Sequence, residues 1–253
     1  MKNLGCYNPG DTNASKQARN SSLKTEEPLS ATVEEYLETV YNMSAEDEVV
    51  IGARLAEKFR VSAPTVTEML KRLVRDGYIT MDAKRVVMLT EAGYAAAEAV
   101  LRRHRLTERF LVDMLGMQWH QVHEEAHHLE HFISGAVEAR VVASLHHPTT
   151  CPHGNPIPGL VPSARTYLKD QGALRLSSIG VGQQATILCI SEVVEDEEAL
   201  ILHLHEKGLT PETRLTVLTN DSLDEEENFC LRVDGREVRI SEAVAAKIWV
   251  TKV

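Results

Sequence analysis

One stretch, HRLTERFLVDMLGMQWHQVHEEAHHLEH at positions 104–131, constrains the fold of this chain more than any other. It holds six of the eleven histidines of the chain, mixed with glutamates at helical intervals. Each helical residue advances by about 100°, so the later part of the stretch gathers metal-binding side chains on one face. The residues that share this face are His123, His127, Glu130 and His131. On a preceding helix, His104 and Glu108 are four residues apart and also share a face.

Matched histidine and glutamate side chains on two helices predict a metal site, because facing helices commonly build such sites. Imidazole nitrogen with carboxylate oxygen suits manganese, iron, cobalt, nickel or zinc better than calcium or magnesium. A polar helix face without metal is the simpler interpretation of a single histidine. The two matched sets favour a bound ion.

The same residues also match sequence motifs of zinc hydrolases. Residues 123–127 match H-E-x-x-H, and residues 127–131 match the inverted form H-x-x-E-H. A zinc-dependent hydrolase that uses Glu124 as a general base beside a metal-bound water is therefore an alternative. Overlapping matches also arise by chance in a segment dense in His and Glu, and a DNA-binding pattern directly precedes this one. We therefore predict that the chain is not an enzyme.

The preceding segment has the pattern of a winged helix-turn-helix. Residues 51–90 carry eight Lys or Arg against four Asp or Glu, although the whole chain has a net charge of -10. Two short helices are expected in IGARLAEKF and RVSAPTVTEMLKRLVRDGYI, with Ser62 as the cap of the second. A basic hairpin, YITMDAKRVVMLT, follows. Such a locally basic module can bind phosphates even in an acidic chain.

The start of the second short helix offers small side chains that could meet base edges and thymine methyl groups. These candidates are Ser62, Pro64, Thr65, Thr67 and Glu68. The surrounding basic side chains are candidates for phosphate contacts. They are Arg54, Arg60, Lys71, Arg72, Arg75, Lys84 and Arg85.

Composition divides the chain into consecutive parts. Residues 1–28 are rich in Asn, Ser, Gly and Lys and lack apolar periodicity, so we expect a disordered arm. An amphipathic helix follows, with Thr32 as its N-cap and Glu35 completing a capping box. We expect a winged helix at 29–95, a helical domain at 96–160, a linker at 161–173 and a small β-barrel of short strands at 174–253. The acidic runs EDEE and DEEE are interpreted as solvated loops.

Apolar runs, the N-terminus and the cysteines indicate where in the cell the protein is expected. No apolar run approaches the ~18 residues that a membrane span needs. The N-terminus lacks a signal pattern, so we expect a cytoplasmic protein without membrane contact. The four cysteines are far apart and form no Cys-x-x-Cys pair, so neither a zinc ribbon nor a disulfide framework is indicated.

Taken in order, the winged helix, RRHRLTERFL, VHEEAHHLEH and CPHGNPIPG resemble the diphtheria toxin repressor family of metal-dependent transcriptional regulators. The resemblance covers roughly residues 30–253. It implies a mainly α fold with β structure: an N-terminal winged helix-turn-helix, a helical dimerisation domain and a C-terminal SH3-like small β-barrel. It also implies a homodimer that binds a palindromic operator in double-stranded DNA and represses genes of metal homeostasis.

The resemblance further implies two metal sites. The ancillary site would consist of His104, Glu108, His123, Glu192 and Glu195, the last two from the C-terminal domain. The primary site would consist of Glu35, His127, Glu130 and His131. Iron sensors of the family have Met and Cys where this chain has Glu35 and His127, whereas manganese sensors have Asp and Glu. A set without a thiolate favours Mn(II) or Fe(II), and Zn(II) is also compatible.

The family pattern selects six residues for contact with DNA: Arg54, Ser62, Pro64, Thr65, Thr67 and Arg75. In the expected mechanism, a metal ion joins Glu35 to the dimerisation helices and holds the winged helix at a fixed angle. Two other regulators stay open as alternatives. The first activates transcription, because operator position decides between activation and repression. The second binds DNA without metal, and its histidines only stabilise the dimer.

Overall fold

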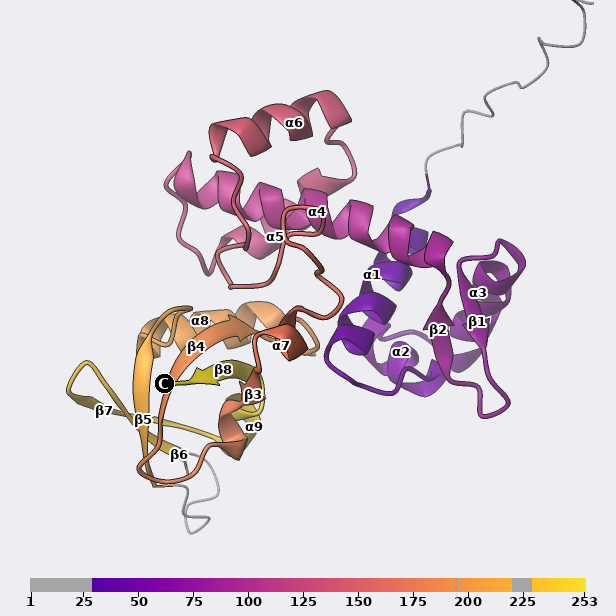
Figure 1. The fold of residues 1–253 in the computed structure, drawn as a ribbon. Coiled ribbons are helices and arrows are strands. Elements are labelled where there is room, and N and C mark those ends of the chain that lie inside the picture. Colours follow the sequence, from indigo (N-terminus) through magenta and orange to yellow (C-terminus); the bar gives the residue numbers. More distant parts are fainter. Residues whose placement is uncertain (1–28, 195, 220–228) are drawn as a thin grey trace, which may run out of the picture. The chain divides into compact units, whose positions relative to one another are not determined.

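The computed structural model describes residues 29–194, 196–219 and 229–253, and Ala31–Val253 forms one compact unit. A three-helix module with a hairpin, a helical middle part and an antiparallel sheet follow one another along this unit (Figure 1). This is the mixed fold that the sequence predicts. The predicted arm at 1–28 lies outside the described residues. In the part of the chain that the structure describes, no helix is long and apolar enough to cross a membrane.

The N-terminal module is a winged helix-turn-helix. Its elements are α1 Ala31–Ala45, α2 Gly52–Phe59, α3 Ala63–Arg75, β1 Ile79–Met81 and β2 Val87–Leu89. The apolar side chains that recur along α1 are buried, as their spacing predicts. Ser62 caps α3, because its hydroxyl accepts the Thr65 backbone N–H at 3.4 Å. The two strands pair antiparallel, with Ile79 opposite Leu89.

The start of α1 differs from the prediction. The helix begins at Ala31, one residue before the expected N-cap Thr32, so Thr32 lies inside the first turn. The predicted capping box is therefore wrong. The Glu35 carboxylate lies instead 3.7 Å from the imidazole of His127, a residue of a distant helix.

The middle part consists of three helices. They are α4 Glu91–Asp113, α5 Val122–Glu130 and α6 Gly135–Ser144. The Thr90 hydroxyl caps α4 by accepting the Gly93 backbone N–H at 3.1 Å. Both α1 and α5 pack against α4, and Leu111, Val122 and Ala126 form a small core between α4 and α5. The long helix α4 therefore brings α1 and α5 together around its polar side chains.

The C-terminal part is an antiparallel sheet with short helices. Within the described residues its strand order is β3-β8-β4-β5-β6-β7. The strands are β3 Leu174–Arg175, β4 Gln184–Ile190, β5 Arg214–Thr219, β6 Phe229–Val233, β7 Arg236–Ile240 and β8 Ile248–Lys252. The helices are α7 Tyr167–Asp170, η1 Leu176–Ser178, α8 Glu197–Lys207 and α9 Glu242–Ala245. One core of buried apolar residues lies under the sheet. Each strand falls where a β-prone run predicts it.

The acidic run EDEE departs from its interpretation as a solvated loop. Glu197 begins α8, and Asp196 caps this helix by accepting the Ala199 backbone N–H at 3.0 Å. Acidic side chains in a first turn interact favourably with the helix dipole, which explains the helix start. The Glu197 side chain is only 10% exposed, and it contacts His123. The second run, DEEE, lies outside the described residues.

The C-terminal sheet is anchored to the end of α1. The Glu46 carboxylate accepts the Ser191 hydroxyl at 2.7 Å and the Arg175 Nη2 at 2.7 Å. Arg175 also lies over the Trp249 ring, 3.8 Å from its centroid. On α2, the Lys58 ammonium donates to the Val194 carbonyl at 2.6 Å. The first two helices of the winged helix therefore both contact the C-terminal part.

Candidate metal centres

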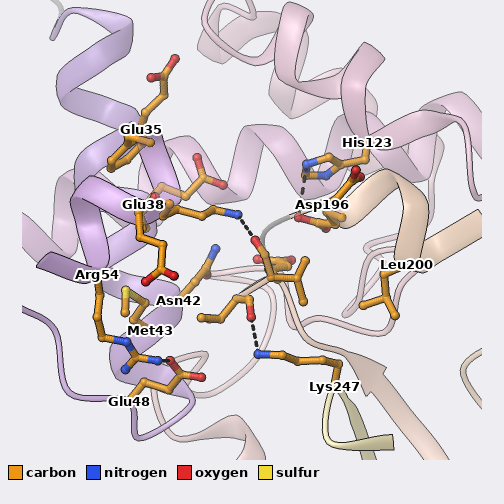
Figure 2. A pocket seen from close by; sticks show the side chains of 18 of the residues that line it. Glu35, Glu38, Asn42, Met43, Glu48, Arg54, His123, Asp196, Leu200 and Lys247 are labelled. Atoms are coloured by element: carbon orange, nitrogen blue, oxygen red, sulfur yellow. Dashed lines mark hydrogen bonds and ion pairs between the residues drawn. The ribbon is translucent and has the colours of Figure 1, made fainter. Parts of the chain in front are cut away.

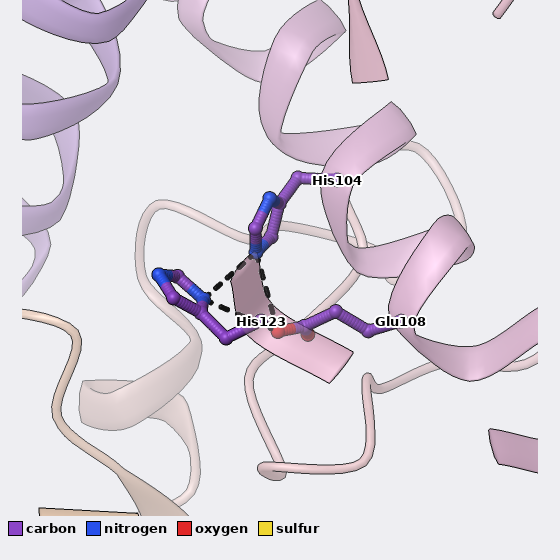
Figure 3. Close-up of side chains that lie close together, drawn as sticks. All are labelled: His104, Glu108 and His123. Atoms are coloured by element: carbon purple, nitrogen blue, oxygen red, sulfur yellow. Dashed lines mark hydrogen bonds and ion pairs between the residues drawn. The ribbon is translucent and has the colours of Figure 1, made fainter. Parts of the chain in front are cut away.

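The first cluster of possible ligands joins α4 and α5. His104 Nε2 lies 3.2 Å from Glu108 Oε1 and 3.2 Å from His123 Nδ1 (Figure 3). His123 Nδ1 in turn lies 3.4 Å from Glu108 Oε1. His104 and Glu108 are buried, and the His123 side chain is 29% exposed. The arrangement brings together the three helical residues that the sequence assigns to an ancillary site.

The charges around this first cluster reinforce one another. Burial alone would lower the pKa of His104, but Glu108 and Glu130 outweigh it and hold the pKa well above the usual range. Burial likewise opposes a charge on His123, yet Glu197 and Glu108 raise its pKa to about 9. Burial alone would raise the pKa of Glu108, but His153 and His104 outweigh it and hold the pKa well below the ordinary value. In the absence of an ion, the protons on His104 and His123 therefore supply the positive charge that a bound cation would supply.

The second cluster lies at the C-terminal end of α5. Glu130 Oε1 is 3.2 Å from His127 Nδ1 and 3.2 Å from His131 Nε2. Glu130 is fully buried. Among the described residues, neither Glu130 Oε1 nor His131 Nε2 has a hydrogen-bond partner. Buried polar atoms without a partner are costly, and a cation bound between them would satisfy both. The donor set therefore fits a divalent transition metal.

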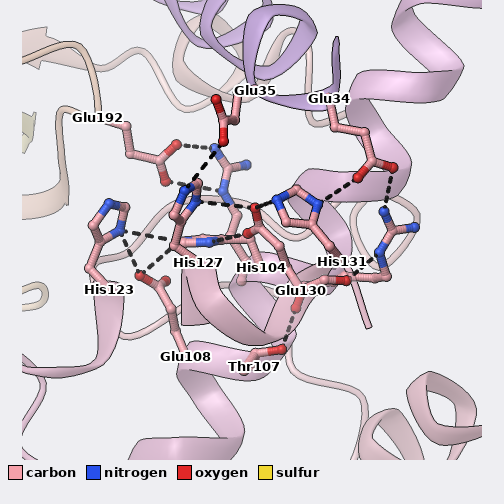
Figure 4. Close-up of polar contacts among 12 residues, drawn as sticks. Glu34, Glu35, His104, Thr107, Glu108, His123, His127, Glu130, His131 and Glu192 are labelled. Atoms are coloured by element: carbon pink, nitrogen blue, oxygen red, sulfur yellow. Dashed lines mark hydrogen bonds and ion pairs between the residues drawn. The ribbon is translucent and has the colours of Figure 1, made fainter. Parts of the chain in front are cut away.

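Helix α1 closes the second cluster with carboxylates. Glu35 Oε1 lies 3.7 Å from His127 Nε2. Glu34, which the sequence analysis did not single out, accepts His131 Nδ1–H at 2.6 Å and Arg103 Nη2 at 2.9 Å (Figure 4). Because a carboxylate only accepts, the His131 Nε2 lone pair is left facing Glu130. A carboxylate behind a histidine is the usual support of a metal ligand.

The two clusters are connected through one buried hydrogen bond. His104 Nδ1–H donates to Glu130 Oε2 at 2.6 Å, which leaves His104 Nε2 for the first cluster. Burial alone would raise the pKa of Glu130, but His104 and His127 outweigh it and bring the pKa to about 2. Glu130 therefore belongs to both clusters, one oxygen to each.

A cavity of about 760 Å³ opens onto both clusters. It lies between α1 and α2 on one side and the segment after β4 with the start of α8 on the other (Figure 2). Glu35 and Glu38 line the α1 side, and His123 lines the other. Burial, opposed by His104 and reinforced by Glu130, raises the pKa of Glu38 to about 7. Glu38 was not among the predicted ligands, although its spacing of three residues from Glu35 was a usable signal.

Glu192, a predicted ligand from the C-terminal part, is held by an arginine of α4. The Glu192 carboxylate is bound by Arg105, with Oε2 2.7 Å from Nη2 and Oε1 3.1 Å from Nε. Glu195 lies outside the described residues. Instead Glu197 reaches the cluster, with its Oε2 3.3 Å from His123 Nε2.

A further group of possible ligands shares Glu108. It combines Glu108 with Cys151 and His153 of the CPHG loop, all three buried. His153 Nδ1 lies 3.1 Å from Glu108 Oε1, and His153 Nε2–H donates to the Trp119 carbonyl at 2.8 Å. The thiol makes this group better suited to a soft ion such as zinc. Cys151 was not among the predicted ligands, and only the fold brings it beside Glu108.

The predicted DNA-contact residues lie on the winged helix. Ser62, Pro64, Thr65, Thr67 and Arg75 are exposed along α3 and at its cap. Arg54 on α2 is partly buried and paired with Glu48. Arg75 is paired only with its exposed neighbour Asp76 among the described residues. The start of α3 therefore presents small side chains to solvent, with basic side chains around them.

The zinc-hydrolase motif does not form one site. His123 belongs to the cluster with His104 and Glu108, whereas His127 belongs to the cluster with Glu130 and His131. Glu124, the proposed general base, is exposed. The two histidines of H-E-x-x-H thus serve different clusters.

Known proteins match all three parts of this chain. Residues 28–87 match the iron-dependent repressor N-terminal DNA-binding domain, residues 90–159 the iron-dependent repressor metal-binding and dimerisation domain, and residues 174–252 the FeoA domain.

Individual relatives agree with these matches. The iron-dependent repressor IdeR of Mycobacterium tuberculosis is 40% identical over 193 residues, which cover 74% of this chain and 84% of IdeR. The diphtheria toxin repressor of Corynebacterium jeikeium is 36% identical over 210 residues, covering 76% of this chain and 88% of that protein. The solved structure of a manganese-dependent transcriptional repressor in complex with manganese superposes with a TM-score of 0.74 at 32% identity, covering 87% of this chain and 100% of that chain. The chain therefore belongs to the family of iron- and manganese-dependent transcriptional repressors that includes IdeR and the diphtheria toxin repressor.

Proposed function

We propose that this repressor is switched by an ion held between α1 and α5, with Glu35, His127, Glu130 and His131 as the primary ligands. The observation that carries the proposal is the pair of buried atoms Glu130 Oε1 and His131 Nε2, 3.2 Å apart without hydrogen-bond partners in the described part of the chain. When bound, the ion supplies a positive charge that carboxylates of α1 and imidazoles of α5 can share.

The chain's own residues prepare this site. Glu34 holds His131 by its Nδ1–H, and Arg103 holds both Glu34 and the Glu130 carbonyl, the latter at 2.8 Å. Without an ion, Glu35 meets His127 only through a contact of 3.7 Å, so α1 is tied to the end of α5 by Glu34 and can still turn about its own axis. A shared ion fixes α1, and with it the angle of α2 and α3. The ion must bind the DNA-competent state more tightly to shift the equilibrium.

An ancillary site is proposed beside the primary one. Its ligands are His104, Glu108 and His123, completed by Glu192 and Glu195 of the C-terminal domain. Support for it comes from the 3.2 Å approach of His104 Nε2 to both Glu108 and His123. Mn(II) and Fe(II) suit both nitrogen and oxygen sets, and Zn(II) is compatible with them.

The regulator is proposed to act as a homodimer on a palindromic operator in the cytoplasm. Two recognition helices would then enter successive major grooves about 34 Å apart. Contacts with DNA are assigned to Arg54, Ser62, Pro64, Thr65, Thr67 and Arg75. The domain borders are placed at 29–95, 96–160 and 174–253, joined by a linker at 161–173.

The test is fluorescence anisotropy of the metal-stripped full chain on DNA of its own promoter. Mn(II), anaerobic Fe(II) and Zn(II) are titrated at one salt concentration, because affinity for DNA depends on salt. We expect tight binding only with metal, and the order of the ions identifies the preferred one. Binding that is equal with and without metal would overturn the proposal.

Substitutions separate the primary site from the rest of α5. His131→Ala should abolish metal-dependent DNA binding, since it removes a primary ligand. His128→Ala is the matched control, because this histidine is exposed on the same helix and belongs to neither cluster. A His131→Ala protein that still responds to metal as strongly as His128→Ala would refute the ligand assignment.

A further inference from the structure

A buried arginine occupies the junction of all three parts of the molecule. Arg105, on α4, is 3% exposed. Its guanidinium binds the Glu192 carboxylate through Nε and Nη2, at 3.1 and 2.7 Å. Nη1 donates to the Pro156 carbonyl at 2.6 Å, and Nη2 also donates to Asn42 Oδ1 of α1 at 3.2 Å. One side chain thus joins α1, the CPHGNPIP loop and the segment that follows β4.

The pair of Arg105 and Glu192 is built as a strong interaction. The planar guanidinium matches a carboxylate with two parallel N–H groups, and both Glu192 oxygens are used. The side chains are 4% and 9% exposed. Burial alone would raise the pKa of Glu192, but Arg105 outweighs it and holds the pKa below the ordinary value. Glu192 is therefore an ionised carboxylate that already has a cation.

Glu192 also lies within reach of the first metal cluster. It lines the same cavity as His104 and His123, and Figure 4 shows it on the side of the cluster that faces α1. As an ancillary ligand, Glu192 would bring the ion beside the guanidinium that binds both of its oxygens, so two cations would compete for one carboxylate. A carboxylate cannot offer the same lone pairs to a guanidinium and to a metal ion without loss to one of them.

We propose that Arg105 is an internal competitor of the ancillary metal, and that Glu192 exchanges the guanidinium for the bound ion. The exchange rests on the ancillary site proposed above. Arg105 is always charged, so it sets a threshold: only an ion that binds Glu192 more strongly than the guanidinium completes the site. Arg105 itself stays in place, because Pro156 and Asn42 still accept from it.

The exchange couples the ancillary site to the DNA-binding module. The Arg105 Nη2 group is shared between Glu192 at 2.7 Å and Asn42 at 3.2 Å. When Glu192 leaves, Asn42 becomes the main side-chain acceptor for this group, and its hydrogen bond shortens. Because Asn42 belongs to α1, occupancy of the ancillary site strengthens the hold of α4 on α1.

The exchange can be observed directly by NMR of the uniformly ¹⁵N-labelled full chain. The Nε–H signal of Arg105, assigned with Arg105→Lys, is followed while diamagnetic Zn(II) is added to two equivalents per chain. We expect this signal to shift as it loses Glu192, together with the ring signals of His104 and His123. Histidine signals that shift while the Arg105 signal stays would overturn the exchange alone. If the histidine signals also stay, the ancillary site itself is refuted.

Variants measure the competition by equilibrium dialysis with Zn(II) and Mn(II). Arg105→Met should bind the ancillary ion about 10- to 150-fold more tightly, because a charge-assisted pair of about 1.5–3 kcal/mol no longer opposes it. Arg109→Met is the matched control: this arginine also lies on α4 and binds the Thr150 and Cys151 carbonyls, but its carboxylate partner is Asp113. Its affinity should match that of the wild type.

Two further variants keep the test decisive. Arg105→Lys retains the positive charge but lacks the planar guanidinium, so its affinity for the ancillary ion should also rise, by a smaller factor. This variant replaces Arg105→Met if the latter does not fold. In a Glu192→Gln background, Arg105→Lys should change the affinity no further, since the contested carboxylate is gone. Unchanged or weaker binding by the Arg105 variants would overturn the competition.

Discussion

At the scale of single residues, hydrogen bonds decide which nitrogen of His104 and of His131 faces the proposed metal centres. His104 donates Nδ1–H to Glu130, and His131 donates Nδ1–H to Glu34. In its neutral form each histidine then has its Nε2 lone pair directed into its cluster, and His104 must first lose the proton that its raised pKa retains. This orientation precedes any ion, so the chain selects the ligand atoms itself.

Glu34 should matter for metal affinity although it does not face the ion. Glu34→Gln keeps the shape of the side chain but replaces a charged acceptor of His131 Nδ1–H by a neutral one. We expect Mn(II) affinity to fall about tenfold or more, the usual effect of losing such a support, as measured by electron paramagnetic resonance of free Mn(II). Glu125→Gln, on the exposed face of α5, is the control. Equal affinities of the two variants would show that Glu34 has no supporting role.

Metal binding should release protons at neutral pH. The pKa of His123 is raised to about 9, above the usual 6.5, so this imidazole carries a proton at pH 7 that the ion must displace. Affinity should therefore rise about tenfold per pH unit for each displaced proton, up to about pH 9. Calorimetry in two buffers of different ionisation enthalpy measures the released protons. A heat of binding that is the same in both buffers would contradict this expectation.

The same histidine stabilises the metal-free fold in the opposite pH range. Because its folded pKa is raised, the contribution of protonated His123 is complete below about pH 6.5 and is lost as the pH rises through about 9. We expect the thermal midpoint of the metal-free protein to fall across this window more in the wild type than in His123→Gln. Calorimetric scans from pH 6 to pH 9.5 compare the two.

At the scale of elements, α5, the turn after it and the first turn of α6 expose apolar side chains beside the second cluster. Phe132 is 85% exposed, Val137 50% and Leu129 43%. Neighbouring apolar residues of this size on the surface of a monomer indicate a protein interface, and this segment lies in the part that matches a dimerisation domain.

A charge at the centre of these exposed residues should separate the proposed dimer. We expect Phe132→Glu to sediment as a monomer and to lose tight binding to a two-half-site operator. Val181→Glu adds the same charge at another exposed apolar residue, in the C-terminal part, and should remain dimeric. Analytical ultracentrifugation distinguishes the two, and a dimeric Phe132→Glu protein would place the interface elsewhere.

Periodicity predicted most elements because apolar spacing within one helix or strand is a local property. It located α1 from its buried face and the strands from their β-prone runs, and helical angles placed the ligands of α5 on one side. The prediction failed at Glu197. An acidic run has the composition of a solvated loop, and the contact of Glu197 with His123, a residue distant in the sequence, cannot be read from local spacing. Periodicity missed the hold of Arg105 on Glu192, because these residues are 87 positions apart and meet only through packing of separate parts.

At the scale of the whole described unit, the C-terminal sheet is fastened to the DNA-binding module by a buried carboxylate. The Glu46 side chain is 7% exposed and accepts hydrogen bonds from Ser191 and Arg175. Arg175 in turn lies over Trp249, one of two tryptophans in the chain. A change at Glu46 is therefore reported by an aromatic ring of the sheet.

Neutralising this carboxylate should loosen the sheet from α1. Glu46→Gln should lower the free energy of unfolding by about 1.5–3 kcal/mol, the range for hydrogen bonds to a charged group, and change the emission of Trp249 in a Trp119→Phe background. Glu98→Gln removes the charge from another arginine partner, that of Arg165, and should leave the emission unchanged. Chemical denaturation followed by fluorescence measures both quantities, and identical emission in the two variants would argue against the anchor.

The fastening at Glu46 has a mechanical consequence for α1. The helix is gripped near one end by His131 through Glu34 and beyond the other by Ser191 through Glu46. The two grips are about 18 Å apart at 1.5 Å per residue. A helix held at one end can tilt about that contact. A helix held near both ends can only rotate about its long axis, unless one of the two contacts breaks. We therefore expect the winged helix to move by rotation about the long axis of α1, while the contact between Glu46 and the sheet stays in place.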